Sequence, residues 1–116
     1  MGMDVYGKNP MSERGSYFRN NWWWWRPVAY YICEVAPDIA NRCEHWQSNK
    51  GDGLEEEDCL ALADILQREI DTGKTATWVE RYLKTQEGNE WGYFASVENM
   101  QEFVKFLREC GGFSLC

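Results

Sequence analysis

The fold is indicated most clearly by the last stretch of the chain, Ser96-Val-Glu-Asn-Met-Gln-Glu-Phe-Val-Lys-Phe-Leu-Arg-Glu-Cys-Gly-Gly-Phe-Ser-Leu-Cys116. Ser96 is a favoured N-cap residue, and apolar side chains recur after it at steps of three and four, the spacing of one buried helix face. Gly111 and Gly112 can adopt the left-handed conformation that ends a helix. The last four residues have strand character, and a short isolated strand needs a partner. The helical stripe consists of Val97, Met100, Phe103, Val104, Leu107 and Cys110.

The natural partner for this strand lies at the other end of the chain. Residues 3–6 have the pattern of a short strand, and residues 8–12 that of a turn. We therefore expect Val5 to lie near Phe113 or Leu115, in a small sheet that pairs the N- and C-terminal strands.

The first helical region is predicted after the N-terminal segment. Pro27 suits its first position, because proline has no N–H and that N–H would be unpaired there. The apolar stripe runs on past Pro37, where we expect a kink or a break into two helices near Ala36. Its members are Val28, Ile32, Val35, Ile39, Cys43 and Trp46.

Two further helices are predicted before the last one. Residues 48–53 form a loop by composition, and acids at 55–58 complement the positive end of the helix that follows. That helix stops or bends at residues 71–73. A short helix follows it, and residues 86–91 form a polar connection. The two stripes are Cys59, Leu62, Ala63, Leu66 and Ile70, and then Trp78, Val79, Tyr82 and Leu83.

Together these patterns predict one α+β domain over residues 1–116, mostly helical with four to five helices and closed by the small terminal sheet. A chain of 116 residues with 44% hydrophobic content is long enough to bury a single core. No apolar run could span a membrane, and no signal-peptide pattern is present, so we expect a soluble cytoplasmic protein. The expected core comprises Ile32, Leu62, Leu66, Phe103 and Leu107.

Four consecutive tryptophans mark the candidate site, in Arg19-Asn-Asn-Trp-Trp-Trp-Trp-Arg26. Successive residues turn by about 100° on a helix and alternate on a strand, so neither element buries all four on one side. An aromatic ring can stack a flat ligand, and arginine can hold phosphate or carboxylate with paired hydrogen bonds. The alternative is that two or three of the tryptophans belong to the core. The candidate ligand-binding residues are Arg19, Asn20, Asn21, Trp23, Trp24, Trp25 and Arg26.

The charge distribution agrees with a site in this segment. Residues 1–26 carry four basic and two acidic residues, net +2, whereas the rest of the chain carries −9. An acidic surface without a basic stripe disfavours duplex nucleic acid. An anionic ligand is therefore expected only near the N-terminal segment.

Other chemistry has little support in the sequence. His45 is the only histidine and is interpreted as a helix-surface residue, so no zinc site is expected. The five cysteines are interpreted as reduced core thiols, with Cys33, Cys43 and Cys59 in or at the edge of helices. No nucleophile stands at an informative spacing from a base, so we expect no cofactor, no metal and no catalytic residue, and an enzyme is not favoured.

Several motifs resemble a family of small proteins of unknown function from bacteriophages and bacterial genomes. They are Met1-Gly-Met-Asp-Val-Tyr-Gly7, Tyr17-Phe-Arg-Asn-Asn21, Trp-Trp-Trp-Arg-Pro27, and Ser96-Val-Glu-Asn99 through Gly111-Gly-Phe113 to Cys116, under half of the chain. Three tryptophans precede Arg-Pro in that family, so Trp22 is the departure. The resemblance implies a phage-related context, in which small acidic proteins capture host signal molecules or block host-defence proteins.

Two functions follow as expectations. The first is non-enzymatic capture of a small anionic aromatic ligand, such as a nucleotide or a nucleotide-derived signal. The second is an acidic protein-interaction module or inhibitor that meets a basic partner surface. A concave pocket lined by tryptophan and arginine would favour the first. The oligomeric state stays open, a homodimer included.

Overall fold

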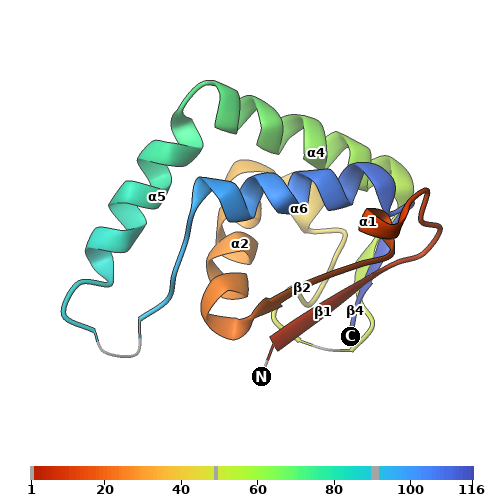
Figure 1. Ribbon diagram of the computed structural model, residues 1–116, viewed down its shortest axis with the longest axis horizontal. Helices are drawn as coiled ribbons and strands as arrows, with labels where there is room; N and C mark the ends of the chain where they lie inside the picture. The colour runs from red at the N-terminus through yellow and green to blue at the C-terminus, as the bar shows by residue number, and fades with distance from the viewer. Residues whose placement is uncertain (1, 49, 90–91) are drawn as a thin grey trace.

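The computed structural model describes residues 2–48, 50–89 and 92–116 (Figure 1). Within these residues the chain forms six helices and one four-stranded sheet, an α+β fold as expected. The helices are α1 (Glu13–Ser16), α2 (Trp22–Val35), α3 (Pro37–Ala40), α4 (Glu56–Asp71), α5 (Lys74–Thr85) and α6 (Val97–Glu109). The strands are β1 (Gly2–Gly7), β2 (Tyr17–Asn21), β3 (Gly53–Leu54) and β4 (Phe113–Leu115).

The sheet joins the two ends of the chain. Its strand order is β2-β1-β4-β3, and every neighbouring pair is antiparallel. Val5 stands opposite Leu115, and the backbone N–H of Cys116 donates to the carbonyl oxygen of Asp4 over 2.8 Å. The predicted pairing of the terminal strands is therefore confirmed.

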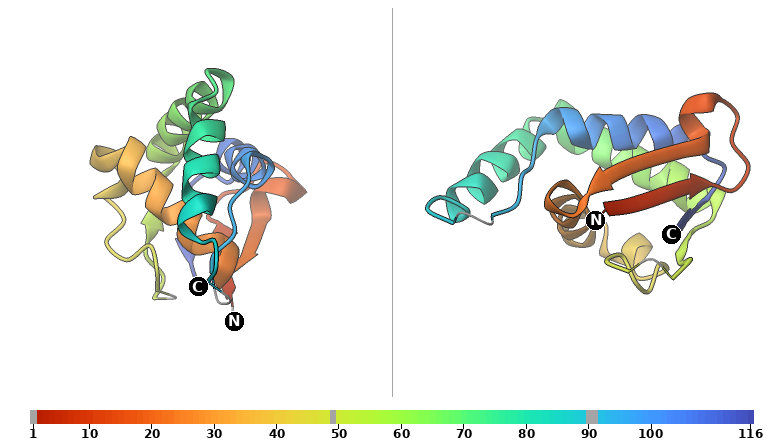
Figure 2. Two further views of the ribbon diagram at one scale, coloured as in Figure 1. Left: turned by 90° about the vertical axis from the view of Figure 1, so that its left-hand side faces the viewer. Right: turned by 60° about the horizontal axis from the view of Figure 1, so that its bottom comes forward.

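The core lies between one face of the sheet and helices α2, α4 and α6 (Figure 2). From the sheet it takes alternate residues, as a half-buried sheet requires, and aromatic rings of α6 pack against them. Phe103 lies 6.2 Å from Phe113 and 5.1 Å from Phe18, between ring centroids. The expected core residues are confirmed as buried: Ile32, Leu62, Leu66, Phe103 and Leu107.

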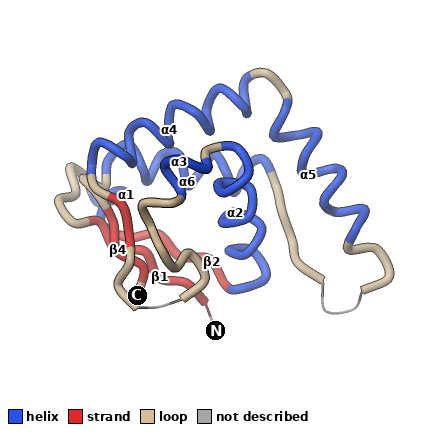
Figure 3. The backbone as a smooth tube through the Cα atoms, turned by 180° about the vertical axis from the view of Figure 1, so that it is seen from behind, coloured by secondary structure: helices blue, strands red, loops and turns tan. Residues whose placement is uncertain are grey.

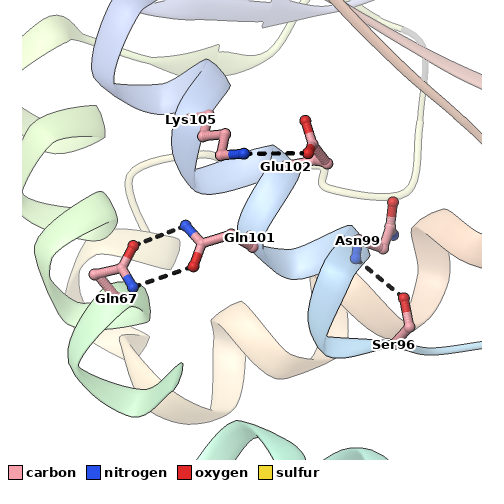
Figure 4. Close-up of polar contacts among 6 residues, drawn as sticks. All are labelled: Gln67, Ser96, Asn99, Gln101, Glu102 and Lys105. Carbon is pink, nitrogen blue, oxygen red and sulfur yellow. Dashed lines mark hydrogen bonds and ion pairs between the residues drawn. The ribbon is translucent and has the colours of Figure 1, made fainter. Parts of the chain in front are cut away.

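Helix α6 has the predicted ends. The hydroxyl oxygen of Ser96 accepts a hydrogen bond of 3.0 Å from the backbone N–H of Asn99, which is the N-cap bond. Gly111 and Gly112 have φ values of 64° and 95° and turn the chain back into β4. Side by side with α6 runs α4, and the amides of Gln67 and Gln101 join the two helices through reciprocal bonds of 3.1 and 2.8 Å (Figure 4).

The first helical region differs from the prediction at both of its ends. Helix α2 begins at Trp22, because the side chain of Asn21 caps it by accepting from the N–H of Trp24, and Pro27 lies inside the helix. The predicted break at Ala36 is confirmed, since α3 starts at Pro37. Helix α3 ends at Ala40, so Cys43 and Trp46 are buried from turns and not from a helix.

Helix α5 turns away from α4 at Gly73, whose φ of 81° allows the sharp corner. Seen from behind, α5 runs down one end of the molecule, on the opposite side of α2 from the sheet (Figure 3). Residues 92–96 then lead back to α6. A cavity at this corner is lined by residues of α2, α4 and α5.

Several short elements were not predicted or were predicted differently. Strand β2 has few apolar residues, and its Asn–Asn end resembles a loop. Strand β3 begins at Gly53, the last residue of the predicted loop 48–53. A Cβ on Gly53 would lie 1.7 Å from the Phe113 carbonyl oxygen, so glycine permits this close approach. His45 lies in a turn region outside any helix. Asn49, Glu90 and Trp91, from the predicted loop and the polar connection, and Met1 lie outside the described residues.

Candidate functional site

The tryptophan run forms the first turn of α2, so its side chains fan out around the helix axis. Trp25 is fully buried, Trp22 and Trp24 are half-buried, and Trp23 is 37% exposed. As predicted, the helix does not bury all four rings on one side. Where the run meets the surface, it borders two separate depressions.

Trp25 belongs to the core. Its indole N–H donates to the carbonyl oxygen of Trp46 over 2.8 Å, and its ring stands edge-on to Phe103 at 5.5 Å. A fully buried ring offers no face to a ligand. Trp25 is thus a core residue, although we expected it among the ligand-binding residues.

The first depression has a volume of about 320 Å³ and is lined by Trp22, Trp23, Arg26 and Tyr93. We call it the arginine–tryptophan depression. The Arg26 guanidinium carbon lies 5.7 Å from the ring centroid of Trp22 and 5.7 Å from that of Tyr93. Its Nη1 donates to the Tyr93 hydroxyl over 3.1 Å. Arg26 is therefore positioned by two aromatic rings.

The charge of Arg26 also acts on helix α5. The pKa of Tyr82 is raised to about 12, mainly by burial and also by nearby Tyr30 and Tyr93, whereas the positive charge of Arg26 lowers it. The guanidinium and these tyrosines therefore share one neighbourhood between α2, α5 and residues 92–96.

The second depression, also about 320 Å³, lies beside Trp24. Asn20 and Asn99 line it, and their amides are joined by reciprocal hydrogen bonds of 3.1 and 2.9 Å. Figure 4 shows the Ser96 cap that holds Asn99 at the start of α6. Glu98 and Glu102 also line this depression, so its charge disfavours an anion.

Arg19 and Asn21 lie apart from both depressions. Arg19 stands on β2 opposite Asp4, and its Nε lies 3.2 Å from the Asp4 carboxylate. Asn21 uses its side chain to cap α2. The structure therefore distributes the seven candidate residues over the sheet surface, the core and two depressions, and their role in binding stays a prediction.

Sequence reasoning missed Tyr93 and Phe94, which complete the surface around the run. Phe94 is 52% exposed and stacks on Trp24 with ring centroids 5.6 Å apart. Its backbone N–H donates to the carbonyl oxygen of Trp23 over 2.8 Å. The sequence does contain a signal for this contact. A proline inside a helix has no N–H to donate, so Pro27 leaves the carbonyl oxygen of Trp23 without its usual helical partner.

The remaining candidates have ordinary surroundings. His45 Nδ1 lies 2.5 Å from the Asp52 carboxylate. Cys43, Cys59 and Cys110 are buried free thiols, whereas Cys33 is exposed and so differs from the expected core thiol.

Of the acids at 55–58, Glu55 pairs with Lys8 and Asp58 with Arg42. Among the described residues, no group of three or more His, Cys, Asp or Glu could hold a metal ion.

No protein-family model, curated protein or solved structure matches this chain. The resemblance to the phage and bacterial family therefore stays a prediction. No helix in the described ranges is long and apolar enough to cross a membrane.

Proposed function

We propose that the protein binds a small anionic ligand with a flat aromatic ring, such as a nucleotide or a nucleotide-derived signal, at the arginine–tryptophan depression. One observation carries the proposal: Arg26 is half-buried between two aromatic rings and pairs with no carboxylate among the described residues.

Arg26 differs from the arginines that form ion pairs, and it differs from Arg14, Arg68 and Arg81, which form none among the described residues, because those three are exposed whereas Arg26 is half-buried. Arg19, Arg42 and Arg108 each pair with an aspartate. Such pairing is expected in a chain with a net charge of −7, where carboxylates are plentiful. Arg26 donates one bond to the neutral Tyr93 hydroxyl, so other guanidinium N–H groups are left for an incoming anion.

The aromatic neighbours supply the second half of the recognition. Trp22, Trp23 and Tyr93 line the same depression, and Trp23 is 37% exposed. Stacking of one base on such a ring contributes about 1–3 kcal/mol. A stacked ring would also position its attached phosphate near Arg26. The concave shape supports ligand capture over the alternative, an acidic protein-interaction module.

Calorimetry with a panel of mononucleotides and linear and cyclic dinucleotides tests the proposal. Adenosine and inorganic phosphate belong in the panel, because the first lacks the anion and the second lacks the ring. We expect at least one nucleotide to bind more tightly than either of them. Native mass spectrometry of the purified protein would detect a ligand that is retained during purification.

Arginine-to-glutamine variants at three positions test whether Arg26 is the residue that binds the anion. Arg26→Gln should weaken binding by at least about tenfold, because a charge-assisted hydrogen bond is lost. Arg14→Gln removes the same charge from an exposed position on α1 and should leave affinity unchanged. Arg19→Gln tests whether the site extends to the sheet. Circular dichroism of each variant separates lost binding from lost folding.

Two results would contradict the proposal. One is the absence of binding across the whole panel, which would favour the protein-interaction alternative. The other is a folded Arg26→Gln variant that binds nucleotides as tightly as the parent protein.

A further inference from the structure

A third cavity, of about 440 Å³, lies at the corner between α4 and α5. Its volume is in the range of small-molecule sites. It is bordered by the C-terminal ends of α2 and α4 and by one face of α5, elements that Figure 3 shows around this corner. None of its lining residues belongs to the arginine–tryptophan depression. We call it the corner cavity.

Aromatic rings held by neighbouring side chains form one wall of the corner cavity. Tyr31 is 2% exposed, and its hydroxyl group lies 2.8 Å from the hydroxyl oxygen of the fully buried Thr75. The ring of Trp78 lies 4.7 Å from that of Tyr31 and stacks on Tyr82 at 4.9 Å. The rings of Tyr31 and Trp78 are therefore both held in place by contacts with neighbouring side chains.

Two carboxylates reach the corner cavity from different helices. Glu34 comes from the last turn of α2, and Glu69 from the last turns of α4. Both act on the same phenol: burial raises the pKa of Tyr31, and the negative charges of Glu69 and Glu34 raise it further. The two carboxylates therefore create a region of negative potential beside the Tyr31 hydroxyl.

Two cations line the corner cavity from α5. Lys74 and Arg81 are seven residues apart, which is two helical turns, so they lie on the same face of the helix. Among the described residues, neither cation forms an ion pair, and the same holds for Glu34 and Glu69. The cavity thus offers both signs of charge beside an aromatic wall.

We propose that the corner cavity binds a small zwitterion, with its ammonium group at Glu34 and Glu69 and its carboxylate at Lys74 and Arg81. A simple anion would meet two carboxylates, and a simple cation would meet two basic side chains. A molecule that carries both charges is the class that satisfies all four groups. The methylene chain between the charges would lie along Trp78.

The test uses a ladder of zwitterions that differ in the separation of their charges: glycine, β-alanine, γ-aminobutyrate, δ-aminovalerate and ε-aminocaproate. Caproate and hexylamine serve as singly charged controls of similar apolar size. Binding is followed by nitrogen–proton NMR at the Trp78 indole and at the Thr77 amide. We expect one chain length to bind best, and at least about tenfold more tightly than either control.

Variants on α4 and α5 test which charged side chains bind the zwitterion. Glu69→Gln and Arg81→Gln should each weaken binding of the preferred zwitterion by at least about tenfold. Glu80→Gln and Lys84→Gln make the same changes on α5 at positions that do not line the cavity, so they should leave affinity unchanged. Glu80, Arg81 and Lys84 are exposed and Glu69 is half-buried, so the variants should keep the fold, which circular dichroism checks.

Three results would overturn the assignment. The first is no shift at Trp78 or Thr77 with any member of the ladder up to about 10 mM, which is weaker than useful recognition. The second is equal binding of a zwitterion and a singly charged control. The third is a response confined to Tyr93, which would put the ligand in the arginine–tryptophan depression. Nucleotide binding is measured separately, so a failure of the zwitterion proposal can be distinguished from a failure of the nucleotide-binding proposal.

Discussion

The backbone N–H of Phe94 donates a hydrogen bond of 2.8 Å to the carbonyl oxygen of Trp23. In an uninterrupted helix that carbonyl would accept from residue 27, but Pro27 has no N–H to give. The proline inside α2 therefore frees an acceptor, and residues 92–96 use it. This contact brings Tyr93 and Phe94 to the tryptophan run, from about 70 residues further along the chain.

Pro27→Ala should loosen this contact. Alanine would offer a helical N–H to the Trp23 carbonyl, in competition with Phe94. Because a typical hydrogen bond contributes about 1 kcal/mol, we expect hydrogen exchange at the Phe94 amide to become about fivefold faster. Pro37→Ala is the control, because Pro37 occupies the first position of α3, where no N–H is required. Unchanged exchange at Phe94 in Pro27→Ala would show that the carbonyl serves both donors.

Leu107→Ala should destabilise the protein by about 2–5 kcal/mol, because it leaves a cavity at a fully buried position of α6. Leu60→Ala is the matched control on α4. That leucine is 38% exposed, so we expect a loss below about 1 kcal/mol. Thermal and urea unfolding measure both values. Equal effects of the two substitutions would contradict the assignment of the buried faces.

The amide pair of Asn20 and Asn99 should behave as one unit. Replacing either residue with alanine leaves the other half-buried amide without its partner, at a cost of about 1–3 kcal/mol. The double variant should lose less than the sum of the single ones, with a coupling of about 1 kcal/mol. A double-mutant cycle in urea measures this coupling. Additive losses would mean that water replaces each partner.

Stability should fall at alkaline pH, in part through Cys43. Burial raises the pKa of this thiol from 9.0 to about 12, with smaller contributions from nearby charges. Between these values the unfolded chain releases a proton that the folded protein keeps, so its contribution to stability is fully present below pH 9.0 and is lost as pH rises towards 12. Cys43→Ala should reduce the decline of unfolding free energy with pH, by at most about 1.4 kcal/mol per pH unit. Urea melts across this alkaline range measure the slope, and an unchanged slope would contradict the buried environment of Cys43.

The sequence by itself determined the elements that depend on residues only a few positions apart. Ser96, the apolar stripe behind it and the two glycines define α6, because cap, periodicity and stop are all set by residues within a few positions of one another. Pro37 and Gly73 likewise ended α2 and turned α4 into α5. The pairing of the terminal strands also followed, since β4 needed a partner and residues 3–6 were a natural candidate.

The start of α2 depended on a choice between two local signals. Asn21 and Pro27 are both favoured at helix beginnings, and the cap at Asn21 prevailed because residues 92–96 satisfy the carbonyl that Pro27 leaves free. Strands β2 and β3 similarly exist through pairing with β1 and β4, and their own residues carry little strand character.

Which residues come together at the candidate site depends on the tertiary structure. The tryptophan run indicated a candidate surface, but local sequence could not assign Trp25 to the core or bring Tyr93 to Arg26. The four charges of the corner cavity come from three helices, and they meet because Gly73 folds α5 back beside α2. Helix periodicity sets which residues share a face, whereas the contacts between faces depend on packing among segments far apart in the chain.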